Sequence, residues 1–280
     1  MNIDNAIKKA CKELTRNKIS SALLDSELLL SEVLKKDRKF ILLNLDKELE
    51  ESDQENFNDL IIKRSKGKPL AYLIGSKSFW NYDFKVNEKV LIPRPDTEII
   101  IEQVLDIYKN KNNLNFLEVG IGSGCIVLSI LKEKKSFFAT GVDLSKECIK
   151  ICRYNANKLK VGNRIKLLKT DVDNLIFRKY DLIVSNPPYI KKFDLNKLSR
   201  EVINYEPKLA LDGGLEGLSV IRKVIKKSSE LIKRHGKLIL EIGYDQRLPV
   251  IKMLNENNFY INKTVKDLAK NDRCIISTKK

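Results

Sequence analysis

Short apolar runs alternate with amphipathic segments from about residue 114 onward, and this alternation restricts the fold more than any other feature of the sequence. Runs of strand length are expected at 115–119, 138–142, 165–169, 181–185, 237–242, 260–264 and 273–277. Segments of helical length are expected at 125–131, 146–158, 218–233 and 246–257. This order predicts an α/β fold with a parallel sheet covered by helices on both faces. The short link between the last two strands predicts an antiparallel end to the sheet.

The first 75 residues have a different pattern, in which apolar side chains recur at helical spacing. Helices are expected near 3–11, 21–34, 40–42 and 52–66. Gly67 ends the last of these helices, and Pro69 prevents its continuation. Residues 1–75 are therefore expected to form a small helical bundle as a separate N-terminal domain.

A β-hairpin is expected over residues 76–92, where it links the bundle to the rest of the chain. Its turn is expected at residues 81–83. A proline-rich segment follows, in which Asp96 or Thr97 can start the next helix. The third expected domain, residues 93–280, contains the sheet.

The chain has 280 residues and a formal net charge of +16. Such a charge suits a polyanionic partner such as RNA. Lysine is spread along the whole sequence, so composition explains the charge equally well and both interpretations stay open. No apolar run approaches the ~20 residues that span a bilayer, and the first residues lack the apolar core of a signal peptide. A cytoplasmic protein without membrane association is expected.

The five cysteines are scattered, and the chain has a single histidine, His235. Cys148 and Cys152 would share one face of a helix, but no second Cys or His pair accompanies them, so no metal site is expected. Free thiols in a reducing compartment are expected instead. His235 precedes a glycine and is expected at the C-terminal end of a helix.

A glycine-rich loop directly follows the expected strand at 115–119. It reads Gly120-Ile121-Gly122-Ser123-Gly124, and an apolar helix starts at Cys125. Glycines allow a sharp turn and a close approach of the backbone to a ligand, and a strand before and a helix after are the context in which such a loop binds a cofactor. The pattern differs from the dinucleotide fingerprint G-x-G-x-x-G, and no G-K-[S/T] follows, so a nucleoside triphosphate loop is disfavoured.

Two acidic residues follow the next two expected strands. Asp143 can accept hydrogen bonds from both hydroxyls of a ribose. Asp171 is placed to meet an adenine amino group, with Val172 against the ring. Because ligands bind at the carboxyl ends of the strands in α/β sheets, these residues and the glycine loop predict a cofactor with an adenine and a ribose at that edge.

A second motif, Asn186-Pro187-Pro188-Tyr189, follows the expected strand at 181–185 and so lies at the same edge. A planar amide or aromatic amino group has two N–H donors, which the Asn186 side-chain oxygen and the Pro187 carbonyl can accept while Tyr189 stacks on its plane. Such a nitrogen is a poor nucleophile, so positioning and stabilisation of its growing positive charge would be the main contributions to its attack on a methylsulfonium. This segment alone is equally compatible with nucleic-acid bases and amides.

Several segments together resemble the peptide chain release factor N5-glutamine methyltransferases, the PrmC/HemK family, along nearly the whole chain. They are the cofactor loop at 118–124, the active-site segment at 186–190, the distinctive signature Leu91-Ile92-Pro93-Arg94-Pro95-Asp96-Thr97-Glu98, and the segments at 67–75, 205–218 and 272–273. The resemblance implies a class I S-adenosylmethionine-dependent methyltransferase fold. In this fold a Rossmann-like seven-stranded sheet follows a small N-terminal helical bundle and a linking β-hairpin.

The resemblance also implies an activity. A methyl group would pass from S-adenosyl-L-methionine to the glutamine of the Gly-Gly-Gln motif of bacterial class I release factors, leaving S-adenosyl-L-homocysteine. By position, Gly120 to Gly124, Asp143 and Asn186 would contact the cofactor, and Asn186 to Tyr189 would hold the glutamine amide. Val172 departs from those members that carry an aromatic residue against the adenine. The N-terminal bundle, which has a separate fold and no chemistry of its own, is expected to recognise the release factor.

Two other functions stay open. An amino-methyltransferase acting on adenine or guanine of RNA or DNA would share the Asn-Pro-Pro-Tyr chemistry, although a DNA enzyme has to flip its base and usually carries a separate target-reading domain. A non-catalytic RNA-binding protein with a vestigial methyltransferase fold would suit the charge. It predicts decay of the cofactor loop or of Asn186, and both are intact.

Overall fold

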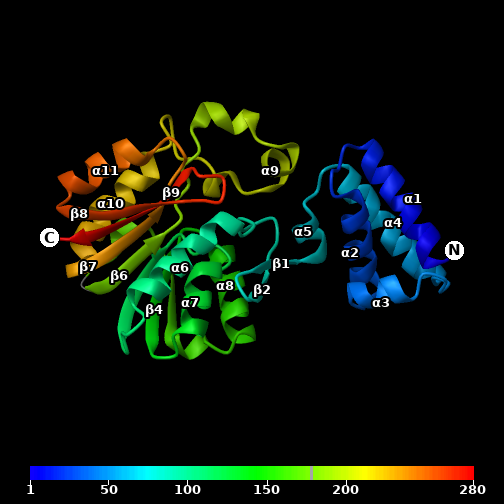
Figure 1. Ribbon diagram of the computed structural model, residues 1–280, viewed down its shortest axis with the longest axis horizontal. Helices are drawn as coiled ribbons and strands as arrows, with labels where there is room; N and C mark the ends of the chain where they lie inside the picture. Colours follow the sequence, from blue (N-terminus) through cyan, green and yellow to red (C-terminus); the bar gives the residue numbers. More distant parts are fainter. Residues whose placement is uncertain (177–178) are drawn as a thin grey trace. The chain divides into compact units, whose positions relative to one another are not determined.

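The computed structural model describes residues 1–176 and 179–280, which form two compact units. The first unit comprises Met1–Ser76 and Ser199–Tyr205, and the second comprises Lys77–Leu198 and Glu206–Lys280. Figure 1 shows the helical character of the first unit and the layered sheet of the second. The expected hairpin falls almost entirely within the second unit.

The first unit is built from helices. These are α1 Ile3–Arg16, α2 Ala22–Leu34, α3 Arg38–Leu43, α4 Glu51–Ser65, α5 Leu70–Ile74 and α9 Arg200–Tyr205. The Asn2 side chain caps α1 by accepting a hydrogen bond from the Asn5 backbone N–H, as expected for an N-cap asparagine. The sequence does not predict α5. Pro69 stops α4 from continuing but then serves as the N-cap of this further short helix, because the fixed φ of proline suits a helix start.

One buried ion pair interrupts the apolar core of the helical unit. Arg64 Nε donates to Asp25 Oδ2 at 2.6 Å, and the two side chains are only 5% and 3% exposed. Arg64 Nη1 also donates to Glu201 Oε1 at 2.7 Å and to the Lys68 carbonyl at 3.1 Å. Since a buried charge is tolerated only when it is paired and hydrogen-bonded, Arg64 joins α4 to both α2 and α9.

The hairpin consists of β1 Ser76–Phe79 and β2 Tyr82–Lys85. Its turn lies at Trp80 and Asn81, so the expected turn at 81–83 is wrong by one residue. Trp80 adopts a left-handed φ of 54°, and its backbone N–H and indole N–H are bound by Glu98 and Glu133. These long-range bonds hold the backbone of a bulky residue in a turn conformation that its side chain alone disfavours.

A seven-stranded sheet forms the centre of the second unit, as far as the described residues show. Its strands are β3 Leu114–Val119, β4 Phe137–Asp143, β5 Ile165–Lys169, β6 Tyr180–Ser185, β7 Ile232–Glu241, β8 Phe259–Lys266 and β9 Asp272–Lys279. The spatial order is β5-β4-β3-β6-β7-β9-β8. The strands from β5 to β7 are parallel, and β9 is antiparallel to both β7 and β8. The predicted parallel sheet with an antiparallel end is confirmed.

Helices cover both faces of this sheet (Figure 1). The helices are α6 Glu98–Ile107, α7 Cys125–Glu133, α8 Lys146–Lys158, α10 Ser219–Leu231 and α11 Arg247–Glu256. Side chains of α6, α7 and α8 pack into one apolar core on one face, and those of α10 and α11 pack into a second core on the other. The central strands β3, β4 and β6 are mainly apolar because both of their faces are buried, whereas the edge strands β5 and β8 are more exposed.

The start of β7 differs from the sequence expectation. Helix α10 ends at Leu231 and β7 begins at once, whereas the helix is expected to continue to residue 233. The pairing of β7 with β6 then shifts in register, and His235 lies in the resulting bulge with φ of 63°. The expectation that His235 ends a helix is therefore wrong. Within residues 1–176 and 179–280, no helix is long and apolar enough to cross a membrane.

Candidate active site

Parallel strands bring the predicted site residues to one edge of the sheet. Val119 at the end of β3 pairs with Ser185 at the end of β6. Gly120 and Asn186 are the next residues on these strands, so the glycine loop and the Asn-Pro-Pro-Tyr segment leave the sheet as neighbours. Because β4 and β5 run parallel beside β3, Asp143 also lies at this edge, where ligands bind to open α/β sheets.

The glycine loop depends on three residues with left-handed backbone. Gly120, Gly122 and Gly124 have φ of 78°, 51° and 83°. A Cβ on Gly124 would lie 2.5 Å from Cys152 Sγ and 2.9 Å from a Leu128 methyl, so both conformation and packing exclude a side chain there. A Cβ on Gly120 or Gly122 would meet nothing within 4 Å, which leaves open space beside the loop at the sheet edge.

The half-buried Asp143 carboxylate holds the glycine loop in shape. Its Oδ2 accepts a hydrogen bond from Gly122 N at 3.0 Å, and its Oδ1 accepts one from Ser145 N at 2.8 Å. Each oxygen of a carboxylate can accept more than one hydrogen bond. Asp143 therefore keeps acceptor capacity for a ligand beside the loop. The other two loop residues, Ile121 and Ser123, are buried.

Asp171 has a cationic partner that the sequence does not reveal. Lys223 Nζ on α10 donates to its Oδ2 at 2.6 Å, and the Asp173 backbone N–H donates to its Oδ1 at 3.0 Å. Burial acts to raise the pKa of Asp171, but the bonds from Lys223 and Asp173 outweigh it and lower the pKa. The next residue, Val172, is buried at the start of the 3-10 segment η3 Val172–Asn174. The carboxylate is thus ionised, and part of its hydrogen-bonding capacity is already used before any ligand binds.

The Asn186 amide is fixed by a residue from the proline-rich signature. Asn186 Nδ2 donates to Thr97 Oγ1 at 3.1 Å, and Thr97 is buried at the end of the 3-10 segment η1 Pro95–Thr97. Because Nδ2 is committed to Thr97, Oδ1 is the atom of this amide that is left to accept a hydrogen bond from a ligand. Pro187 is buried and Pro188 is half-buried, as expected for a rigid backbone at this position.

Tyr189 is anchored at both its backbone and its hydroxyl. The hydroxyl donates to Glu241 Oε1 at 3.1 Å and accepts from Arg273 Nη1 at 3.4 Å. The Tyr189 carbonyl accepts from Gln246 Nε2 at 2.9 Å. Burial and the negative charge of Glu241 raise the pKa of the Tyr189 hydroxyl, so it stays protonated. The ring is held from its hydroxyl end.

The sequence does not predict the side chains that support the site. They are Thr97, which binds Asn186, and also Lys223, Glu241 and Arg273. A local signal exists for one of them. Glu241 is the single acid in the apolar run at 238–242, and an acid inside a buried strand requires a partner. A similar acid in β3, Glu118, is fully buried and accepts a hydrogen bond from Val127 N at 2.8 Å. Burial raises the pKa of Glu118.

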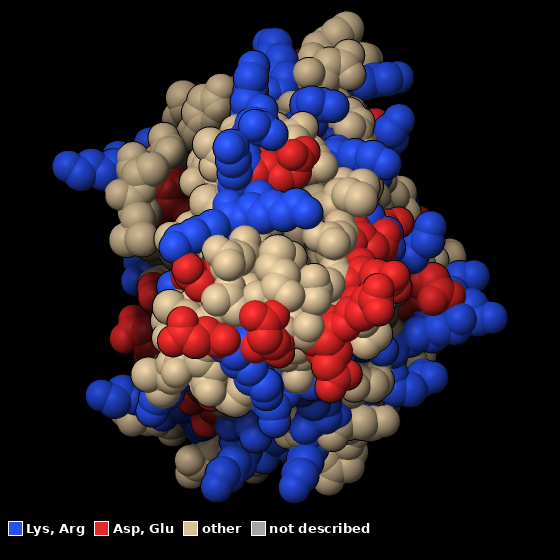
Figure 2. Space-filling model, turned by 90° about the vertical axis from the view of Figure 1, so that its right-hand side faces the viewer, with Lys and Arg blue, Asp and Glu red and all other residues tan. Residues whose placement is uncertain are grey.

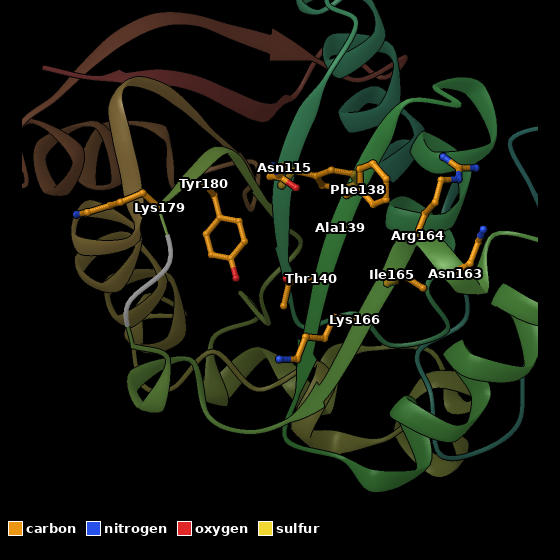
Figure 3. A pocket seen from close by; sticks show the side chains of 11 residues that line it. Asn115, Phe138, Ala139, Thr140, Asn163, Arg164, Ile165, Lys166, Lys179 and Tyr180 are labelled. Atoms are coloured by element: carbon orange, nitrogen blue, oxygen red, sulfur yellow. The ribbon is translucent and has the colours of Figure 1, made fainter.

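A separate cavity of about 520 Å³ lies toward the other ends of the strands. Figure 3 shows its labelled lining residues, which include Asn115 near the start of β3, Phe138 near the start of β4 and Lys166 near the start of β5. These positions precede the strand ends that carry Gly120 and Asn186. The cavity is therefore distinct from the candidate active site.

Charge on the face shown in Figure 2 is mixed. Acidic side chains form a band across the middle of this face, with lysine and arginine side chains above and below it.

The sheet order, the glycine loop after β3 and the strand-end motif after β6 define a class I S-adenosylmethionine-dependent methyltransferase fold. Residues 97–215 match the family model described as methyltransferase small domain, and residues 5–75 match the one described as PrmC N-terminal domain. A solved methyltransferase from Pyrococcus furiosus has the same fold, with a TM-score of 0.54 over 80% of this chain and 98% of that one at 17% identity.

Curated relatives narrow the class to one family. The release factor glutamine methyltransferase of Clostridium acetobutylicum is 37% identical over 100% of this chain and 99% of its own length. The enzyme of the same name from Fusobacterium nucleatum is 39% identical over 97% of this chain and 77% of its own. The chain belongs to the release factor glutamine methyltransferase family.

Proposed function

We propose that this protein transfers a methyl group from S-adenosyl-L-methionine to the side-chain amide nitrogen (N5) of the glutamine in the Gly-Gly-Gln motif of bacterial class I release factors. The observation that carries the proposal is the Asn186 amide, whose Nδ2 donates to Thr97 at the strand end beside the glycine loop and whose Oδ1 is thereby left as an acceptor. Relatives that match the chain end to end support glutamine as the target. A role in translation termination implies a cytoplasmic location.

The residues at the strand ends fit S-adenosylmethionine. Gly120 and Gly122 face open space, Asp143 keeps acceptor capacity for ribose hydroxyls, Asp171 is ionised for an adenine amino group, and Val172 adds an apolar surface. When bound, S-adenosylmethionine supplies an electrophilic methyl carbon that the amide nitrogen attacks, while the C–S bonding pair stays on sulfur.

The chain's own contribution is to position the amide nitrogen and to stabilise the charge that grows on it. Asn186 Oδ1 and the Pro187 carbonyl would accept its two N–H groups, and Tyr189, held at its hydroxyl, would lie against its plane. Positioning of this kind contributes up to ~7–11 kcal/mol in ideal cases, and the two acceptors become more favourable as the nitrogen turns positive. The surplus proton on nitrogen can leave after the transfer, so no strong base is required before it.

The proposal is tested by offering purified release factor, ribosomal RNA and DNA in parallel with radiolabelled S-adenosylmethionine. Label in the glutamine of the release factor is the expected result. Label in RNA or DNA alone would instead favour the amino-methyltransferase of bases, which shares the Asn-Pro-Pro-Tyr chemistry. A failure to bind S-adenosylmethionine in a titration, with Asn186→Ala as the comparison, would favour a non-catalytic protein.

Replacement of Asp143 with alanine is expected to weaken S-adenosylmethionine binding by the ~1–3 kcal/mol that hydrogen bonds to a charged group contribute. The loss includes the bond that holds Gly122 N, so the empty loop should also become less ordered. Calorimetric titration measures the dissociation constant. Asp106→Ala, which removes an exposed carboxylate on α6, is the matched control. Unchanged affinity together with reduced turnover would contradict the assignment of Asp143 to the ribose.

The helical unit is proposed to recognise the release factor outside its Gly-Gly-Gln loop, because this unit has its own core and a matching family model of its own. Removal of residues 1–75 should lower kcat/KM for intact release factor by ~30-fold or more, the effect of losing one interface hot spot of ~2 kcal/mol. Affinity for S-adenosylmethionine should persist. Equal activity of the truncated and full-length proteins on intact release factor would defeat this assignment. Direct contact with nucleic acid is not required.

A further inference from the structure

A buried carboxylate lies behind the Asn-Pro-Pro-Tyr segment. Glu241, the last residue of β7, is 2% exposed. Its Oε1 accepts a hydrogen bond from the Tyr189 hydroxyl at 3.1 Å, and the Thr97 hydroxyl is near enough to the same carboxyl group to lower its pKa. Thr97 in turn accepts a hydrogen bond from Asn186 Nδ2. Glu241 therefore reaches both ends of the segment, Tyr189 directly and Asn186 through Thr97.

The direction of these hydrogen bonds determines which way the Asn186 amide faces. An ionised carboxylate can only accept, so the Thr97 hydroxyl would turn its hydrogen toward Glu241 and keep its oxygen as an acceptor. That acceptor selects Nδ2 of Asn186, and Oδ1 is left to face an amide substrate. A protonated Glu241 can donate instead, which allows Thr97 to donate to Oδ1 with the amide turned over. The substrate N–H would then meet a donor.

A dedicated ion pair does not explain why the Glu241 carboxyl group is buried. The cation that acts on it is Arg273, whose guanidinium already forms an ion pair with Asp267, with Nη2 to Oδ2 at 2.9 Å. In the described part of the chain, Glu241 Oε2 is buried without a hydrogen-bond partner of normal geometry. A carboxylate with a purely structural role is normally satisfied, so a buried acid that is only partly bonded points to function.

We infer that Glu241 is a positioning residue for the methyl transfer, whose ionised carboxylate fixes the orientation of Asn186 through Thr97 and holds Tyr189 at its hydroxyl. It acts through these side chains and does not touch the substrate. The inference rests on the proposed function, because the orientation that Glu241 selects is the one that accepts the N–H of a glutamine amide.

The surroundings of Glu241 place its ionisation in the neutral range. The titratable and charged groups that face it are Tyr189 after β6, Asp96 in η1, Arg273 and Cys274 on β9, and Cys125 at the start of α7. Burial raises the pKa of Glu241 to about 7, because it outweighs the hydroxyl donors and the guanidinium, which lower it. Burial also raises the pKa of both thiols, so they stay neutral. As pH falls through neutrality, Glu241 takes up a proton and the constraint on Asn186 is lost.

The rate of transfer to purified release factor at saturating substrates is therefore expected to fall with one ionisation near pH 7 as pH is lowered from ~8.5 to ~6. In Glu241→Gln this acidic limb should disappear, and kcat at high pH should be ~10–100-fold lower, because a glutamine can accept or donate and selects neither orientation. The affinity for S-adenosylmethionine should not change. Glu230→Gln, an exposed carboxylate near the end of α10, is the matched control and should keep both the rate and the limb.

A double-mutant cycle separates positioning from mere support of the fold. If Glu241 acts on Asn186 through Thr97, the losses of kcat in Thr97→Val and Glu241→Gln should be strongly non-additive, with the double variant little worse than either single one. The carboxyl carbon of Glu241 in ¹³C-labelled wild-type protein, assigned by its loss in Glu241→Gln, should titrate near pH 7. The variant is needed only once, to assign the signal. The titration itself uses wild-type protein and requires no turnover.

Three results would overturn the inference: a Glu241 carboxyl that titrates below pH ~5, an acidic limb that survives in Glu241→Gln, or additive losses in the cycle. Each can occur while wild-type protein methylates the release factor, so the proposed function would stand. Absence of label in the release factor at every pH would instead defeat the proposed function, and the ¹³C titration would still report on Glu241.

Discussion

Asn186→Ala is expected to reduce kcat for release-factor methylation by ~10²–10³-fold, the size of effect seen when one preorganised hydrogen-bonding group is removed from a transition state. Two losses combine in this variant. The substrate amide loses the acceptor that orients its N–H and stabilises the growing charge, and Thr97 loses the Nδ2 donor that links the site to Glu241. The variant keeps the sheet, because Asn186 lies beyond the last residue of β6. Initial rates of transfer of radiolabelled methyl to purified release factor measure the effect.

Two further variants interpret this result. Asn163→Ala removes an exposed asparagine in the 3-10 segment η2 Gly162–Arg164 and should leave the rate unchanged. Asn186→Asp keeps an outward acceptor but cannot donate to Thr97 as an ionised group, so it should be impaired as well. A rate for Asn186→Ala within a few-fold of wild type would show that the amide nitrogen is held elsewhere.

The sheet could be predicted from the sequence because its signals are local. The central parallel strands are largely buried on both faces and so appear as mainly apolar runs, as in Leu114–Val119 and Tyr180–Ser185. The residues that follow these strands lie at one edge of the sheet, so the glycine loop and Asn186 can be placed together from the sequence. The rule that allows this placement is that the carboxyl ends of parallel strands lie at the same edge of a sheet.

The side chains that support the motif could not be predicted in the same way. Thr97 lies 89 residues before Asn186, and Glu241 lies 52 residues after Tyr189. Hydrogen bonds of this kind depend on the packing of elements that are distant in the sequence, and no spacing rule connects them. The positive φ angles of Trp80 and His235 were missed for a related reason. Long-range contacts or a strand bulge impose them against the local preference of the residue.

The helical unit shows the same limit in its core. The buried residues of α4 are Phe57, Ile61 and Arg64, whereas the apolar Leu60 is only partly buried. An arginine that follows a lysine near the end of a polar helix is expected to be a solvated side chain. Its buried partner Asp25 is 39 residues away on α2, so the pair becomes visible only after the helices pack.

Arg64→Met is expected to lower the stability of the helical unit by ~3–5 kcal/mol, the cost of leaving one member of a buried ion pair without its partner. Methionine fills much of the volume of the arginine stem but cannot donate to Asp25, which is 2% exposed. Glu201 suffers less, because its side chain is 37% exposed and can be hydrated. A chain with two units need not unfold in one step. The measurement is therefore native-state hydrogen exchange of the amides in α2 and α4, which reports the local opening free energy.

Removing the second charge should restore much of the loss. In Asp25→Leu/Arg64→Met no buried charge remains unpaired, and replacing both members of such a pair with apolar side chains is often neutral. The double variant should therefore be more stable than Arg64→Met alone. Lys63→Met is the control, since Lys63 is exposed and its ion pair with Asp59 contributes at most ~1 kcal/mol. If the single and double variants were equally unstable, the loss of stability would come from packing around Arg64 and not from the unpaired charge of Asp25.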